Sequence, residues 1–128
     1  MSNPIVFISR NRVKPGLLAD FQRHYAESIP VTEASKPGTL VQLAYLNEAG
    51  TELEIIRVFP DAEALDGQLQ GADQRSKAAY QYIEPTGIVI YGQPGAFALE
   101  MMKKVASSGI EVNILPSYTG GFIRSGHG

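Results

Sequence analysis

The sequence predicts an α+β fold in which the elements begin in the order β-α-β-β-α-β. Two features of the chain indicate this order. Apolar residues recur at steps of three and four in some segments, as on one face of a helix, and form short β-branched and aromatic runs in others, as in strands. Turns that contain proline and glycine separate these segments, first at Lys14-Pro15-Gly16 and again at Lys36-Pro37-Gly38.

The first half of the chain predicts a strand, a helix and a hairpin. The run Ile5–Ile8 is β-branched and aromatic, as expected of a strand. Helical spacing of apolar residues begins at Leu17, and Pro30 should kink or stop this helix because proline lacks a backbone N–H. Residues 47–50 should then join two further strands into a hairpin, Thr39–Leu46 and Glu52–Phe59.

The next segment predicts a broken helix and a further strand. Asp61 is suited to cap a helix, which should break near Gly71 and resume over about Ala72–Ile83. A strand at Gly87–Tyr91 follows. With this strand the chain has the β-α-β-β-α-β order of a ferredoxin-like domain with an antiparallel sheet.

The last part of the chain should extend the same domain with one helix and one strand. We expect residues 1–92 to form the ferredoxin-like core and residues 93–128 to form the extension. Within the extension, Phe97–Ala106 has an amphipathic helical pattern, and Ile110–Leu115 has the β-branched residues of a strand.

Composition excludes several classes of function. The chain has 128 residues, of which 44% are hydrophobic, and it contains no cysteine, so a disulfide scaffold and a thiolate zinc site are excluded. Its net charge of −2 argues against a nucleic-acid partner. With neither a signal-peptide pattern nor a long apolar run, the sequence predicts a cytoplasmic protein without a membrane partner.

The hairpin strands are apolar on both faces. In Thr39–Leu46 only Gln42 is strongly polar, so neither face of this strand suits exposure to water. Helices can cover one face of a small sheet, and a symmetric partner is the commonest cover for the other. The sequence therefore predicts a homodimer.

The order of elements and the two-sided hairpin resemble the dimeric α+β barrel superfamily and, within it, the antibiotic biosynthesis monooxygenase-like group. The resemblance covers about Pro4–Tyr91 and includes the turn at residues 36–38 and the helix entry Phe59-Pro60-Asp61-Ala62-Glu63-Ala64-Leu65. The chain departs from the group's turn acid, strand acid and histidine, where it has Lys36, Arg57 and Gln68. It also has no tryptophan, which removes the asparagine–tryptophan–histidine set of the haem-degrading relatives.

The resemblance implies a cofactor-free monooxygenase-like enzyme that acts on a phenol- or quinol-like substrate. Such chemistry requires a protein to deprotonate the substrate, hold the anion and exclude water while oxygen reacts. The alternative is a non-catalytic, ligand-binding or stress-response dimer of the same fold. The resemblance implies that no cofactor is needed. We also expect no metal site, because the two histidines, His24 and His127, lie far apart in the sequence.

Two side chains are candidates for catalysis. His24 follows Asp20 by one helical turn, so it is either a base with an orienting carboxylate or part of an exposed pair on the helix surface. Arg57 shares a strand face with apolar residues, where charges are rarely buried without a partner. It either clamps a substrate anion or forms a salt bridge, across the dimer interface or to Glu84.

Several aromatic residues and one amide are candidates for binding a small aromatic ligand. Gln68 could bond a ligand carbonyl, or it could be a solvated helix residue. The aromatic residues either line a pocket or belong to the core. The candidate substrate-binding residues are Phe21, Tyr25, Phe59, Gln68, Tyr80 and Tyr91. A cavity shared by His24 and Arg57 would favour the enzyme over the non-catalytic dimer.

Overall fold

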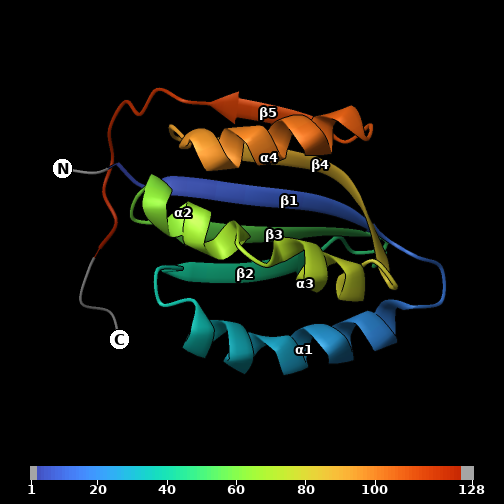
Figure 1. Ribbon diagram of the computed structural model, residues 1–128. Coiled ribbons are helices and arrows are strands. Elements are labelled where there is room, and N and C mark those ends of the chain that lie inside the picture. The colour runs from blue at the N-terminus through green and yellow to red at the C-terminus, as the bar shows by residue number, and fades with distance from the viewer. Residues whose placement is uncertain (1–2, 125–128) are drawn as a thin grey trace.

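The computed structural model describes residues 3–124, apart from the Asp73 side chain, and contains one five-stranded sheet. Its strand order is β2-β3-β1-β4-β5, with antiparallel pairing except between β4 and β5, which are parallel (Figure 1). This is the predicted β-α-β-β-α-β order with one added edge strand. The strands are β1 (Ile5–Val13), β2 (Val41–Leu46), β3 (Glu52–Phe59), β4 (Ile83–Tyr91) and β5 (Glu111–Leu115).

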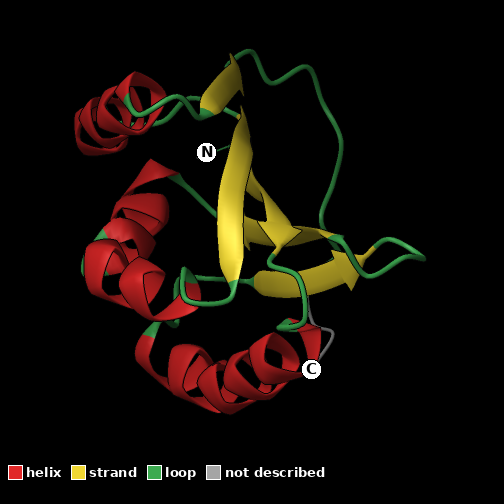
Figure 2. Cartoon of the chain, turned by 90° about the vertical axis from the view of Figure 1, so that its right-hand side faces the viewer, coloured by secondary structure: helices red, strands yellow, loops and turns green. Residues whose placement is uncertain are grey.

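The helices pack along one face of this sheet, and the loop after β5 passes on the opposite side (Figure 2). Asp61 caps α2 as expected, since its Oδ1 accepts a hydrogen bond from the Ala64 N–H at 2.8 Å. Gly71 has a φ of +77°, a conformation that favours glycine, and it separates α2 from α3. The helices are α1 (Leu18–Ser35), α2 (Ala62–Leu69), α3 (Ala72–Ala79) and α4 (Ala96–Ser107).

The first helix does not stop at its proline. Helix α1 continues through Pro30, which is exposed, and ends at Ser35. The proline removes one backbone hydrogen bond from the helix. The helical pattern then reforms, because the Lys36 N–H donates to the Thr32 carbonyl at 2.9 Å.

Two strands are longer than their apolar runs indicate. Strand β1 continues to Val13, because it pairs with β3 on one side and β4 on the other. Strand β4 begins at Ile83, so α3 ends before the predicted position, and the strand includes Pro85. The register between β1 and β4 shifts after Arg10, so Pro85 lies at a bulge, where a missing N–H is tolerated.

The core on the helix side of the sheet has two parts. One lies between the sheet, α2 and α4, and includes the buried residues Phe7, Phe59, Leu65, Ile90 and Met102. The other lies next to α1 and includes Val13, Phe21, Leu53, Ile55 and Ile83. Between the two parts, residues of α3 and of the sheet line the cavity described below.

The opposite side of the sheet, which we call the open face, exposes apolar side chains to solvent. On β2, Leu43 is 46% exposed and Tyr45 is 61% exposed. Farther along β1 the open face becomes charged, where Arg10 lies 3.8 Å from Glu54 and Arg12 lies 3.3 Å from Glu84. None of the helices within residues 3–124 is long and apolar enough to span a membrane.

Candidate functional site

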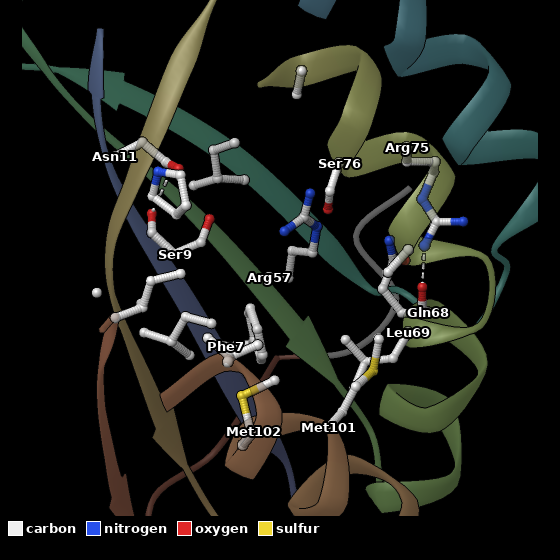
Figure 3. A pocket seen from close by; sticks show the side chains of 18 of the residues that line it. Phe7, Ser9, Asn11, Arg57, Gln68, Leu69, Arg75, Ser76, Met101 and Met102 are labelled. Atoms are coloured by element: carbon white, nitrogen blue, oxygen red, sulfur yellow. Dashed lines mark hydrogen bonds between the residues drawn. The ribbon is translucent and has the colours of Figure 1, made fainter. Parts of the chain in front are cut away.

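A cavity of about 660 Å³ lies between the helix side of the sheet and helices α2, α3 and α4 (Figure 3). Its floor is formed by β1, β3 and β4, and most of its lining is apolar. Phe7, Phe59 and Leu65 are among the apolar residues, and each is at least nine-tenths buried. The volume is within the range of small-molecule binding sites in proteins.

Arg57 lies on the floor of this cavity. It is opposite Phe7 in the register of β1 and β3, and it points toward α3 (Figure 3). Its Nε donates to the Gln42 Oε1 at 3.0 Å, and the Gln42 Nε2 donates to the Tyr25 hydroxyl at 3.2 Å. The guanidinium is therefore oriented by an amide on the neighbouring strand, which is itself bonded to α1.

No carboxylate in the described part of the chain forms a salt bridge with Arg57. The intramolecular alternative, Glu84, pairs instead with Arg12 at 3.3 Å. Burial lowers the pKa of the Arg57 guanidinium; nearby Tyr25 raises it and nearby Arg75 lowers it. Arg57 is thus a partly buried cation beside an apolar cavity, an arrangement that favours an anionic ligand.

All the charged residues that line the cavity in the described part of the chain are positive. The cavity is lined by Arg57, Arg75, Lys77 and Lys104, and no described aspartate or glutamate lines it. The chain as a whole has a net charge of −2, so positive charge is concentrated here. Arg75 serves the fold as well, because it donates to the carbonyls of Gln68 and Gln70 at the end of α2.

Three of the candidate substrate-binding residues line the cavity, namely Phe59, Gln68 and Tyr80. Gln68 is not solvated: it is 6% exposed, and its Oε1 accepts from the Thr39 hydroxyl at 2.6 Å. The amide is held in place beside Arg75 and faces the cavity (Figure 3).

The other three candidates lie elsewhere. Phe21 and Tyr25 both lie on α1 and stack with their ring centroids 5.7 Å apart. Tyr25 reaches the site only through Gln42. Tyr91 alternates with Ile90 along β4 and is exposed on the open face.

His24 is not brought together with Arg57. Its ring lies 5.4 Å from the ring of Tyr82, outside the lining of the cavity. Asp20 lies 3.6 Å from Arg23, so its nearest cation is an arginine on the same helix. No histidine of the described chain lines the cavity, and the shared cavity expected of the two catalytic candidates is not observed.

Two groups of lining residues are not among the candidates that the sequence predicts. On β1, Ser9 and Asn11 face the cavity, and Asn11 is only 4% exposed. On α4, Met101, Met102 and Val105 form a wall. Ser9 and Asn11 share the strand face of Phe7, and polar residues on that apolar face could have indicated a site, whereas the methionines have the pattern of ordinary helix packing.

Comparisons with known proteins identify the fold. No family model matches the chain, and no curated protein matches it. Among solved structures, MupZ from Pseudomonas fluorescens superposes with a TM-score of 0.74 at 17% identity, over 97% of each chain. This match includes the C-terminal helix and strand, because it extends over nearly the entire sequence.

Two shorter proteins match the larger part of the chain. SnoaB, a cofactor-independent oxygenase from Streptomyces nogalater, has a TM-score of 0.59 at 17% identity, over 74% of this chain and 97% of SnoaB. A Bordetella bronchiseptica protein assigned as an antibiotic biosynthesis monooxygenase has a TM-score of 0.57 at 19% identity, over 70% and 95% of the two chains. The chain therefore has the antibiotic biosynthesis monooxygenase-like α+β barrel fold.

Proposed function

We propose that this protein is a cofactor-free, monooxygenase-like enzyme that binds a phenol- or quinol-like substrate as its anion beside Arg57. The observation that carries the proposal is the position of Arg57, which lies on the floor of an apolar cavity with no described carboxylate partner. A partly desolvated cation attracts an anion more strongly than a cation in water does. The function of SnoaB, a cofactor-independent oxygenase of the same fold, supports this choice of chemistry.

The proposed reaction uses oxygen and the bound anion alone. The phenol loses its proton to water, and Arg57 stabilises the phenolate. The phenolate passes one electron to O2, and the two radicals combine at a ring carbon to give a peroxide anion. This anion takes back one proton from water and becomes a hydroperoxide. Loss of one water from this hydroperoxide yields a quinone, so that one O2 is consumed and one water is formed. We assign the proton to water rather than to His24, because His24 lies outside the cavity.

In this reaction the protein binds the substrate, stabilises its negative charge and limits its contact with water. Gln42 fixes the Arg57 guanidinium, so little reorganisation is needed when negative charge develops on the substrate. The apolar floor around Phe7 and Phe59 keeps water away from the ring that reacts.

We also propose that two copies of the chain associate through the open face. Exposed Leu43 and Tyr45 on β2 lie on the same side as Tyr91 on β4, and together they give this face an apolar character. Contiguous exposed apolar surface is typical of protein–protein interfaces. A second copy would cover it symmetrically, as in the class of fold that the chain adopts.

A second candidate function is ligand binding without catalysis. The described lining contains neither a histidine nor a carboxylate, which are the most common general bases. An anion could then bind beside Arg57 and remain unchanged.

A ligand screen with oxygen measurement separates the two functions. A phenol or quinol that binds should raise the free energy of unfolding by about 2.7 kcal/mol at a hundredfold its Kd. Consumption of one O2 per quinone formed would support the enzyme. Stabilisation without oxygen uptake by any bound quinol would support the ligand-binding protein instead.

Replacing Arg57 tests the assignment of the site. Arg57→Met keeps a side chain of similar length without the charge, so it should abolish binding of the anion and leave the fold intact. The matched control is Lys103→Met, which removes a charge from an exposed pair with Glu100 on α4. If Arg57→Met binds the phenol as tightly as the wild type does, the cavity does not use this cation and the proposal is wrong.

A further inference from the structure

We infer that the substrate is elongated: beyond its anionic end it carries an uncharged, apolar arm that lies against helix α4. The inference rests on the proposed function only for the anionic end, which is assigned to Arg57. It adds a second subsite, formed by Met101, Met102 and Val105.

The size of the cavity is the first observation. A dry cavity of about 150 Å³ is enough to hold one benzene ring. The cavity here is about 660 Å³, several times larger than a single ring requires. A one-ring ligand held at Arg57 would cover only part of this lining, and the remaining apolar surface would stay in contact with water.

The chemistry of the walls gives the direction of the arm. On the α3 side the lining carries three charged or polar residues, Arg75, Ser76 and Lys77, beside two alanines. On the α4 side it carries the two methionines and Val105, and one charged residue, Lys104, which is exposed; Met102 is only 4% exposed. Figure 3 shows these two sides lying in different directions from Arg57. An apolar arm therefore gains more free energy by packing against the methionines of α4 than against the α3 side.

The methionines suit an arm rather than a rigid ring. Met101 and Met102 are neighbours in sequence, yet both contact the cavity, one partly buried and one buried. Unbranched thioether side chains adapt to irregular apolar shapes and tolerate ligands of different length. Beneath them the floor is formed by Ile88, which is nine-tenths buried.

The test is a homologous series of 4-alkylphenols, from methyl to octyl, titrated into the full-length protein. Affinity should increase about fourfold with each added methylene, which corresponds to about 0.8 kcal/mol. The increase should stop when the chain has filled the space beside α4. A flat series, in which 4-methylphenol binds as tightly as 4-octylphenol, would overturn the arm while leaving the proposed function intact.

A variant that fills the subsite on α4 with a larger side chain tests whether the arm lies there. Met101→Phe should weaken the long members of the series and leave 4-methylphenol unaffected, whereas Arg57→Met should weaken every member. Ala106→Phe is the matched control, since it adds the same ring to the exposed side of α4. If Met101→Phe fails to fold, Met101→Ala should shift the optimum to a longer chain. Unchanged selectivity in the folded variants would contradict the assignment to α4.

A second series distinguishes failure of the arm from failure of the phenol proposal. Straight-chain carboxylates from butanoate to dodecanoate present the same charge and arm without a ring. If these carboxylates bind with the same length dependence while the phenols do not, the arm is supported and the phenol-like substrate is wrong. If neither series binds, both proposals are overturned.

Discussion

Arg57 and Gln42 form the residue pair on which the candidate site depends. They lie opposite each other in the register of β2 and β3, and the 3.0 Å hydrogen bond between them orients the guanidinium. Because the bond uses Nε, it leaves the two terminal nitrogens of Arg57 for a ligand. The amide of Gln42 has no charge, so it positions the cation without neutralising it.

The Gln42→Glu variant should therefore keep the fold and lose the ligand. A carboxylate at the same position would pair with Arg57 and compete with any anion in the cavity. We expect a melting temperature at least as high as that of the wild type, and a clear loss of affinity for anionic ligands, measured by calorimetric titration. Undiminished binding by Gln42→Glu would mean that the ligand does not use the charge of Arg57.

The pH dependence of binding should reflect the ionisation of the ligand rather than the ionisation of a protein side chain. Burial lowers the pKa of Arg57, so the charged guanidinium disfavours folding. This group would make the free energy of unfolding rise only at a pH high enough to deprotonate it in the folded protein. An arginine nevertheless stays protonated under ordinary conditions. Affinity for a phenol, whose pKa is about 10, should increase about tenfold per pH unit between about pH 6 and 9.

A carboxylate ligand provides the comparison for this measurement. It is fully ionised between about pH 6 and 9, so its Kd should be constant there. A phenol whose Kd is equally constant would be bound in its neutral form, which would exclude the phenolate mechanism.

The sequence could predict which face of the sheet carries Arg57, but it could not predict the wall that α4 forms in the cavity. Strand alternation places Arg57 on the helix side of the sheet, because a strand has only two faces. A helix residue such as His24 has many directions available, and the position of α1 relative to the sheet depends on tertiary packing. The role of Met101 likewise depends on where α4 lies, which no local pattern determines.

At the scale of elements, Pro30 shows how tertiary packing overrides a local signal. The residues before it, including buried Phe21, hold the first part of α1 against the core. The helix then continues past the proline for more than one turn, although the proline cannot donate to the carbonyl four residues earlier. A break predicted from sequence is thus a local cost that the rest of the helix tolerates.

Replacing this proline should stabilise the protein. Pro30→Ala restores a backbone hydrogen bond at an exposed helical position, and the difference in helix propensity is as large as about 3 kcal/mol. We expect a higher denaturant midpoint with an unchanged slope. Ala34→Gly, at an exposed position one turn later, is the opposing control and should lower the midpoint. A less stable Pro30→Ala protein would show that α1 requires the proline.

The ends of elements were the least predictable part of the fold. Strand β4 begins earlier than expected because a bulge accommodates Pro85, and a bulge depends on the register with β1. The break between α2 and α3 was predictable, because Gly71 adopts a positive φ, which glycine tolerates since it has no Cβ atom. Turns and helix caps could thus be predicted from local sequence, whereas the lengths of the strands depend on pairing between strands that are distant in the chain.

At the scale of the whole molecule, the open face predicts association. Leu43 is 46% exposed in a single chain, so an aspartate there would remain solvated in a monomer and become buried only in a dimer. Leu43→Asp should therefore fold normally and sediment as a monomer of 13.9 kDa at micromolar concentration, whereas the wild type should sediment as a dimer. Ala49→Asp in the exposed hairpin loop is the control and should remain dimeric.

A wild-type protein that is monomeric at the same concentration would contradict this association. Severe loss of stability in Leu43→Asp would also contradict it, because the side chain would then be part of the core of a single chain.

The central place of β1 has a consequence for biosynthesis. This strand leaves the ribosome before its two neighbours in the sheet, β3 and β4, which come much later in the chain. Chains are made at about 5–20 residues per second, so β1 waits several seconds for its last partner. Until β3 has emerged, Ile5 and Phe7 have no strand to pair with, and until β4 has emerged one edge of β1 stays open. The nascent chain therefore presents an unpaired apolar strand edge, of the kind that chaperones bind, until β4 has been made.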